Sequence, residues 1–188
     1  MNLVIIKIPM LKTFFVFLLF LFIIPKGIQA FSIKAIQLER TSEGYFVLSL
    51  VFSNFPTQEL ILSLKRQSGN ILILYEFEIY RDRLLGEDLL YKDVYFQRAG
   101  YIPELNKYFL EDNWGYSHFN RAEDLISKIA SLYFFPLNFK NLAPLDRTTY
   151  LLIKVTLKYP SHFNRDLRYT PKEREVILKT SKRYALSP

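Results

Sequence analysis

Cysteine is absent from this 188-residue chain, and histidine and glycine are scarce. Without cysteine the chain cannot form disulfides, thiolate metal sites, iron–sulfur clusters, a thiol nucleophile or a lipidated N-terminal cysteine. The two histidines, His118 and His162, are far apart in the sequence and lack the spacing of metal ligands. The six glycines form no P-loop, dinucleotide-binding or serine-hydrolase motif. We therefore predict no metal and no cofactor.

Basic residues exceed acidic residues only slightly once the N-terminus is set apart. The whole chain has 25 lysines and arginines against 18 acidic residues, a net charge of +7. Lys7, Lys12 and Lys26 belong to the first thirty residues, which contain no acid, and subtracting these three leaves a net charge of +4. Such a small excess, spread along the chain, is typical of a solvated mixed-charge surface, so we expect no nucleic-acid partner.

The N-terminus has the three parts of an export signal. Lys7 and Lys12 precede Thr13–Ile24, which contains no charged residue, and Pro25 then breaks the helix. The small residue Ala30 follows shortly afterwards. This order predicts a signal peptide that is cleaved after Ala30.

An uncleaved membrane anchor is the alternative interpretation. The apolar stretch extends back to Leu3, but two lysines and a proline interrupt it. Its uninterrupted part is short for a spanning helix, which needs about 20 residues. Translation from Met10 instead of Met1 would leave a leader of ordinary length. Under either interpretation the lysines stay on the cytoplasmic side, so residues 31–188 are expected in the periplasm or otherwise outside the cytoplasm.

Strand patterns dominate residues 31–188. Half of the whole chain is hydrophobic and 16% is aromatic, which is enough for a core at this length. Ile71–Arg81 shows the pattern, with apolar residues on one face and Glu76, Glu78 and Tyr80 on the other. The expected strands are Ser32–Arg40, Tyr45–Phe52, Ile71–Arg81, Leu89–Gln97, Leu105–Leu110 and Thr149–Tyr159, with turns at Ser42–Gly44 and Gly100–Pro103.

Two segments have helical spacing. Pro56–Gln67 places apolar residues at helical intervals, with basic residues in its last turn and a glycine after it. A second helix is expected to begin at Asn120, which forms a capping-box pattern with Glu123. Its apolar stripe continues to Tyr133, and Pro136 ends the segment.

These elements predict an α+β fold. It consists of a mainly antiparallel sheet or sandwich of about seven strands with two helices packed on it, preceded by the N-terminal signal or anchor helix. Residues 171–184 fit either a helix or an edge strand. We expect two parts in the chain, the leader at 1–30 and a single domain at 31–188.

Two groups of side chains are candidates for chemistry. Glu76 and Glu78 share a strand face and can bind a cation or act as an acid–base pair, the alternative being a solvated face beside arginines. The second group interleaves a cation with aromatic rings, which can stack on glycans, lipid headgroups or another protein. The alternative, which we favour, is that its rings form core and cross-strand pairs. The candidate binding residues of this group are Arg98, Tyr101, Tyr108, Trp114, Tyr116 and His118.

Several short motifs occur in a familiar order. They are Gly69-Asn70-Ile71-Leu72-Ile73, Tyr101-x-x-Glu104-Leu105-x-x-Tyr108, Phe119 with the segment Arg121–Leu132, and Tyr150-x-x-x-Lys154-x-x-Leu157. In this order the chain resembles a small family of exported bacterial proteins of unknown function, some of which are encoded beside a nitrogen-regulation-type membrane sensor kinase. The resemblance implies an extracytoplasmic α+β module and carries over no catalytic residues.

The sequence leaves three functions open. The first is a non-enzymatic binding or accessory module of the bacterial envelope, whose partner is a membrane sensor or another envelope protein. The second is an envelope enzyme that acts on a glycan or phosphoester through Glu76 and Glu78 or through His118. The third is a carrier of an apolar ligand, because the chain is rich in phenylalanine. We expect the first.

Fractionation of cells that express the full chain tests the leader. We expect the protein outside the cytoplasm with Phe31 as its first residue, because the small residue Ala30 follows the apolar segment. Intact-protein mass spectrometry measures the cleavage site. Full-length protein in the membrane would indicate the anchor, and cytosolic protein that retains its leader would contradict both interpretations.

Overall fold

Nine β-strands and two α-helices make up the part of the chain that the structure describes. The structure is a computed structural model, and it describes residues 30–42, 45–66, 70–137, 148–161 and 174–186. In chain order the elements are β1 (Ser32–Arg40), β2 (Phe46–Ser53), α2 (Thr57–Lys65), β3 (Ile71–Arg83), β4 (Gly86–Ile102), a short 3-10 helix η1 (Pro103–Leu105), β5 (Lys107–Asp112), β6 (Gly115–Phe119), α3 (Ala122–Ile129), β7 (Ser131–Leu137), β8 (Thr149–Ser161) and β9 (Arg174–Ala185).

Some predicted features lie outside these residues. They are the leader, the tip of the first expected turn at 43–44, Gly69, the segment 138–147 and the segment 162–173, which contains His162. Within the described part, no helix is long and apolar enough to cross a membrane. The described residues from Phe31 onward form one compact unit.

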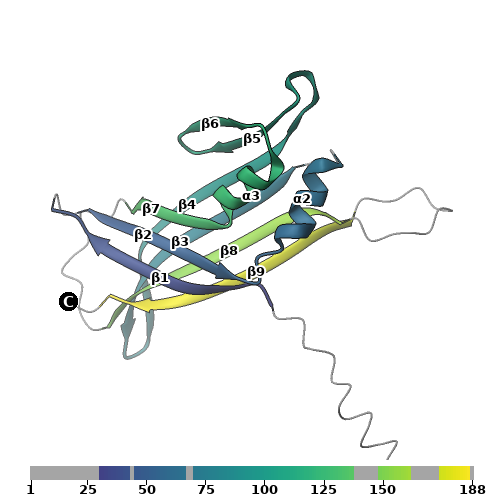
Figure 1. The fold of residues 1–188 in the computed structure, drawn as a ribbon. Helices are drawn as coiled ribbons and strands as arrows, with labels where there is room; N and C mark the ends of the chain where they lie inside the picture. Colours follow the sequence, from purple (N-terminus) through teal and green to yellow (C-terminus); the bar gives the residue numbers. More distant parts are fainter. Residues whose placement is uncertain (1–29, 43–44, 67–69, 138–147, 162–173, 187–188) are drawn as a thin grey trace, which may run out of the picture. The chain divides into compact units, whose positions relative to one another are not determined.

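Two antiparallel sheets form the framework. The smaller has the strand order β1-β2-β7, and the larger has the order β6-β5-β4-β3-β8-β9. Figure 1 shows the small sheet and both helices on the same side of the large sheet. The described chain is therefore an α+β fold dominated by antiparallel sheet, as the strand patterns predict.

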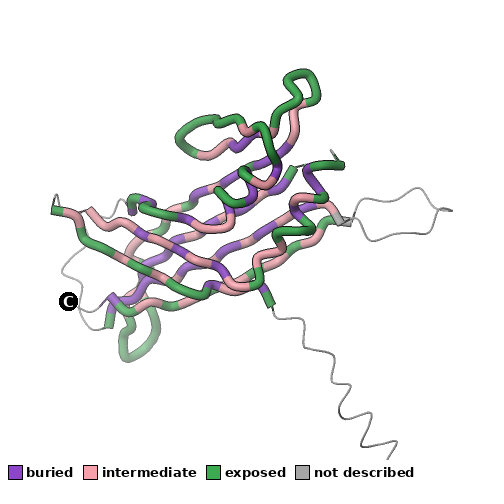
Figure 2. Tube along the Cα trace, in the orientation of Figure 1, coloured by how far each residue is buried: buried purple, intermediate pink, exposed green. Residues whose placement is uncertain are grey.

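Strand β3 lies between β4 and β8 in the large sheet, and its side chains alternate between two environments. Ile71, Ile73, Tyr75, Phe77 and Ile79 are almost completely buried on one face. Figure 2 shows the resulting alternation of buried and partly buried residues along the strands. This alternation identifies the face of the large sheet that is covered by the other elements.

Leucine and isoleucine side chains from β2 and both helices cover that face. The buried ones are Leu48 and Leu50 of β2, Leu60 and Leu64 of α2, and Leu125, Ile126 and Ile129 of α3. Complete burial of such a side chain contributes about 1.5–3 kcal/mol relative to exposure. The helices thus complete the core where the small sheet does not reach.

Strand β4 is longer than the sequence predicts. It continues through Gly100 to Ile102, and the 3-10 helix Pro103–Leu105 makes the turn that was expected to begin at Gly100. Gly100 pairs with Phe109 of β5, and a Cβ atom at Gly100 would lie 2.6 Å from the Phe109 ring. Glycine therefore marks a strand position that an aromatic ring covers closely, rather than a turn.

The predicted capping box at Asn120 is wrong. Helix α3 begins at Ala122, its N-cap residue is Arg121, and no side chain caps it. The Arg121 carbonyl accepts the first helical hydrogen bond from the Leu125 N–H, so Asn120 lies one residue too early to act as the cap. Glu123 instead forms an ion pair with Lys65 of α2, with 2.6 Å between Oε1 and Nζ.

Strands β6 and β7 were not expected from the sequence, which predicts helix up to Pro136. Strand β7 contains a bulge in which Tyr133 and Phe134 together lie opposite Ser49 of β2. Phe134 has a φ of 53°, and its N–H donates a hydrogen bond to the Ser49 hydroxyl oxygen at 3.2 Å. The extra residue returns Phe135 to the buried face.

Strand β9 resolves the ambiguity at residues 171–184 in favour of a strand from Arg174 onward. It pairs with β8 on one side and ends the large sheet. On its other side Lys182 reaches β1, where its Nζ donates to the carbonyl oxygen of Lys34 at 3.1 Å and to that of Ile33 at 3.4 Å. A lysine thus bridges the edges of the two sheets.

Candidate functional site

The six candidate binding residues do not form one surface. The register of β4, β5 and β6 places Arg98, Tyr116 and His118 on the face of the large sheet that points away from the core. Tyr101 and Tyr108 lie opposite each other on the core-facing side, with ring centroids 5.1 Å apart. Trp114 lies in the turn between β5 and β6.

The outward group is a continuous row of ring and charge contacts. Arg98 forms an ion pair with Glu111, and its guanidinium lies 5.8 Å from the centroid of the Phe109 ring. Phe109 stacks on Tyr116 at 5.2 Å, and Tyr116 meets His118 edge-on at 5.0 Å. The Arg98–Phe109 and Phe109–Tyr116 contacts are cross-strand contacts, whereas Tyr116 and His118 are neighbours on one face of β6.

Trp114 forms part of a cavity of about 480 Å³, which we call the Trp114 cavity. Its described lining residues come from β4, the β5–β6 turn, β7 and the start of β2. They are Tyr45, Asp93, Val94, Tyr95, Asn113, Trp114, Phe135, Pro136 and Leu137. A concave site of this volume, lined by aromatic rings together with polar groups, is typical of a small-molecule site.

Three rings form one wall of the cavity. The Trp114 ring centroid lies 5.0 Å from that of Tyr95 and 5.2 Å from that of Phe135, and Tyr95 and Phe135 are 4.7 Å apart. Tyr95 and Phe135 are buried, whereas Trp114 is 62% exposed. Trp114 therefore rests on two buried rings and presents much of its surface to solvent.

Asp112 holds the turn that carries Trp114. One carboxylate oxygen accepts hydrogen bonds from the backbone N–H groups of Trp114, at 2.8 Å, and Gly115, at 3.0 Å. The other accepts from the Tyr95 hydroxyl at 2.9 Å. A single carboxylate thus fixes the turn relative to the ring on which Trp114 rests.

Buried polar groups continue this connection into the core. The Gln97 amide donates to the Tyr95 hydroxyl oxygen at 3.3 Å, and the Tyr75 hydroxyl donates to the Gln97 carbonyl oxygen at 3.1 Å. Burial and the neighbouring Asp112 raise the pKa of Tyr95, and burial raises the pKa of Tyr75. Both hydroxyls therefore keep their protons at neutral pH and act as hydrogen-bond donors.

Asp93 and Asn113 are the polar groups of the cavity wall. The Asp93 carboxylate accepts from the Val94 N–H and from the Tyr91 hydroxyl, both at 2.8 Å. The Asn113 side-chain oxygen accepts from the Phe96 N–H at 2.9 Å. Both side chains thus satisfy the backbone of β4 beside the cavity, and each carboxylate oxygen of Asp93 retains a further lone pair.

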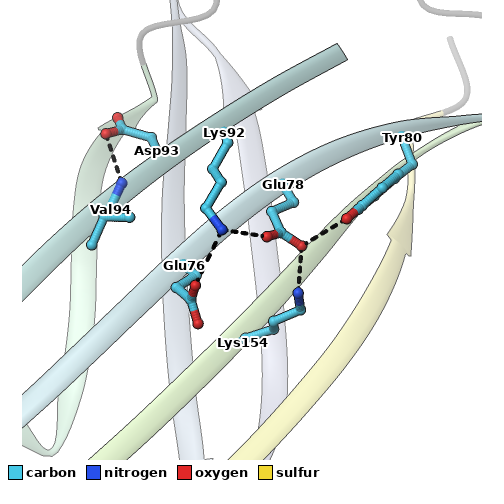
Figure 3. Close-up of polar contacts among 7 residues, drawn as sticks. All are labelled: Glu76, Glu78, Tyr80, Lys92, Asp93, Val94 and Lys154. Atoms are coloured by element: carbon cyan, nitrogen blue, oxygen red, sulfur yellow. Dashed lines mark hydrogen bonds and ion pairs between the residues drawn. The ribbon is translucent and has the colours of Figure 1, made fainter. Parts of the chain in front are cut away.

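Glu76 and Glu78 belong to a separate ion cluster on the outward face of the large sheet. Glu78 is only 3% exposed and accepts hydrogen bonds from Lys154 at 2.6 Å, Lys92 at 2.9 Å and the Tyr80 hydroxyl at 3.0 Å. Figure 3 shows these groups converging on the Glu78 carboxylate, while Lys92 also contacts Glu76, at 3.3 Å. The two carboxylates therefore share one lysine.

Electrostatics keep Glu78 and its two lysine partners ionised. Burial raises the pKa of Glu78, but hydrogen bonds from two lysines and a tyrosine outweigh burial and lower the pKa to about 2. The hydrogen bonds to Glu78 raise the pKa values of Lys92 and Lys154. At neutral pH Glu78 has no proton to donate, and both lysines are protonated and poor nucleophiles.

No protein-family model, curated protein or solved structure matches the chain. The resemblance to exported bacterial proteins therefore stays a prediction from the motifs.

Sequence reasoning identified Trp114 but missed its neighbours in the cavity. Asp93 and Tyr95 lie two residues apart in the expected strand Leu89–Gln97. This spacing places both side chains on one face of a strand, so it was the available signal. Phe135 was assigned to a helix, so its orientation was unknown. The cavity depends on pairings between distant segments, which a local pattern does not contain.

Replacement of Lys154 by methionine tests the ion cluster. The variant leaves Glu78 buried with one cation fewer, so we expect the free energy of unfolding to fall by about 1–3 kcal/mol at pH 7. Because the pKa of Glu78 is depressed from 4.5 to about 2, its contribution is complete above pH 4.5 and is lost as the pH falls towards 2. Urea denaturation across this range measures the difference, which should shrink with acidification.

Lys158→Met is the matched control, because Lys158 lies on the same face of β8. A surface replacement there should change the free energy of unfolding by no more than about 0.5 kcal/mol. An equal loss in both variants, or a Lys154→Met effect that does not depend on pH, would contradict the assignment.

Replacement of Asp112 by alanine tests how Trp114 is held. We expect acrylamide to quench the tryptophan fluorescence more strongly, because the N–H groups of Trp114 and Gly115 and the Tyr95 hydroxyl all lose the carboxylate that accepts their hydrogen bonds. Trp114 is the only tryptophan in the sequence, so the signal reports on this position alone. Glu111 lies next to Asp112 on β5 and forms a surface ion pair with Arg98 of β4. Glu111→Ala is therefore the control, and it should leave quenching unchanged. Equal quenching in the two variants would show that Asp112 does not position the ring.

Proposed function

We propose that this chain is an exported, non-enzymatic binding module of the bacterial envelope, and that the Trp114 cavity is its ligand site. The observation that carries the proposal is the cavity itself. Its aromatic wall is assembled from β4, the β5–β6 turn and β7, and its volume of about 480 Å³ suits a small molecule.

The rigidity of the cavity supports a role in binding. Asp112 fixes the Trp114 turn, and hydrogen bonds through Tyr95 and Gln97 join that turn to the buried Tyr75. A site that is ordered before the ligand arrives avoids the entropic cost of ordering upon binding. An exposed tryptophan held in this way favours recognition of a ligand over a purely structural role.

The ion cluster favours binding over catalysis. A general acid must be protonated at working pH, and a general base needs a pKa near that pH. Glu78 has a pKa of about 2 and engages three donors, so it meets neither condition. Its contacts support a structural role, in which the carboxylate joins β3 to the lysines of β4 and β8.

Export and partnership complete the proposal. The leader at residues 1–30, as a cleaved signal or as an anchor helix, would place the domain at 31–188 in the periplasm. The resemblance to proteins encoded beside a membrane sensor kinase suggests that the ligand-bound module acts on such a sensor or on another envelope protein.

A ligand screen read by Trp114 fluorescence tests the binding function. Protein purified from cells that express the full chain is titrated with sugars, amines, short peptides and fatty acids. At least one class should shift the emission saturably, because a ligand in the cavity displaces water from the exposed ring. Calorimetry checks each response.

Two variants connect any response to the cavity. Pro136→Gly or Phe135→Leu alters the wall and should weaken binding, while Leu84→Ser at the exposed β3–β4 turn should not. If no class of compound binds, or if the wall variants bind with unchanged affinity, the proposed site is wrong.

A further inference from the structure

The arrangement of the Trp114 cavity points to a ligand class, and this step rests on the proposed binding function. We propose that the cavity binds a neutral saccharide, with one pyranose ring stacked on the exposed face of Trp114 and its hydroxyl groups donating to Asp93. Three features carry this assignment: the geometry of the rings, the polar groups beside them, and the charge of the described lining.

The rings form a platform rather than a cage. A cage for an ammonium ion needs aromatic faces that are separated by the ion. Here the centroids of Trp114, Tyr95 and Phe135 lie 4.7–5.2 Å from one another, so the rings already pack together and leave no room for an ion between them. What remains available is the exposed part of Trp114, which suits a flat partner on one side.

A pyranose ring has the surface that such a platform requires. The axial C–H groups of a sugar form an apolar patch whose hydrogens carry a small positive charge. The face of an aromatic ring is electronegative and apolar, so it attracts this patch while the hydroxyl groups at the sugar's edge stay free. Trp114 is held against two buried rings, and stacking therefore needs little further ordering of the side chain.

The polar groups beside the platform suit hydroxyl donors. Asp93 is a carboxylate that lines the cavity, and each of its oxygens can accept another hydrogen bond in addition to those from Val94 and Tyr91. Asn113 is attached to the backbone of β4 through its oxygen and, at 3.5 Å, through its nitrogen, whose second N–H can donate to a sugar oxygen. Vicinal hydroxyl groups match such a pair of acceptor and donor.

Charge argues against anionic ligands. Among the described lining residues Asp93 is charged, and none is a lysine or an arginine. A phosphate or carboxylate would therefore meet a negative group without a compensating cation. Uronic acids, sugar phosphates and phospholipid headgroups are disfavoured relative to neutral sugars.

Titration with defined sugars tests the assignment. The neutral probes are maltose, cellobiose and N,N′-diacetylchitobiose, the anionic probes are glucuronate and glucose 6-phosphate, and the cationic probe is choline. We expect at least one neutral disaccharide to shift Trp114 emission saturably and to bind by calorimetry, and we expect the anionic probes and choline not to bind.

Three variants locate the sugar. Trp114→Ala should weaken binding by about tenfold or more in calorimetry, and Trp114→Phe should retain part of the affinity because a ring remains. Asp93→Asn keeps the shape of the side chain but removes its charge, and it should weaken binding by about tenfold. Asp88→Asn, at a surface ion pair with Arg83 outside the cavity, is the control and should bind as the wild type does.

The outcomes separate this inference from the proposed function. If none of the neutral sugars binds, or if the sugar binds equally well to Trp114→Ala and Asp93→Asn, the saccharide assignment is overturned. If choline, a peptide or a fatty acid binds instead, and does so through the cavity wall, the binding function stands and the ligand class is wrong. Thermal unfolding of each variant confirms that a lost signal does not arise from a lost fold.

Discussion

The two unlike faces of β3 are the constraint on which the described fold depends, because one is fully buried and the other is partly buried around a single buried charge. One face packs its isoleucine and aromatic side chains against the small sheet and the helices. The opposite face buries Glu78, a charge that is tolerated because lysines from β4 and β8 bind it. The ion cluster therefore joins β4, β3 and β8 on the outward face of the large sheet.

Strand β3 is connected to the cavity through the side chain of Tyr75. Tyr75 is fully buried, and its hydroxyl begins the series of hydrogen bonds that passes through Gln97 and Tyr95 to Asp112. Every group in this series needs the others, because an unpaired polar group in the core costs about 1–3 kcal/mol. Trp114 is consequently held by the core itself, which explains how a largely exposed ring in a turn can be ordered without a ligand.

The sequence predicted the elements whose pattern is purely local. Strand β1 has the predicted bounds, and α2 and β8 differ from theirs by a few residues, because strict alternation or helical spacing follows from one buried face. Trp114 was identified as one of the aromatic residues that are interleaved with Arg98 in the sequence. The wall around it was not predictable, since Tyr95 and Phe135 meet only through the register of β4 and the bulge in β7. Asn120 matched a capping motif, but the strand before it determines where α3 begins.

The bulge in β7 explains both the missed strand and the site. Ile129, Ala130 and Tyr133 have helical spacing, so the sequence predicts that the helix continues; the structure turns the chain into a strand after Ala130. Within that strand a regular alternation from Leu132 would bury Phe134 and expose Phe135. The left-handed conformation of Phe134 costs about 1–2 kcal/mol for a residue other than glycine, and the Ser49 hydroxyl offsets part of that cost. The strained backbone at Phe134 turns the Phe135 side chain inward, beneath Trp114. The Phe135 ring that the bulge turns inward also packs against Phe77 of β3, so the bulge shapes both the aromatic wall and the core.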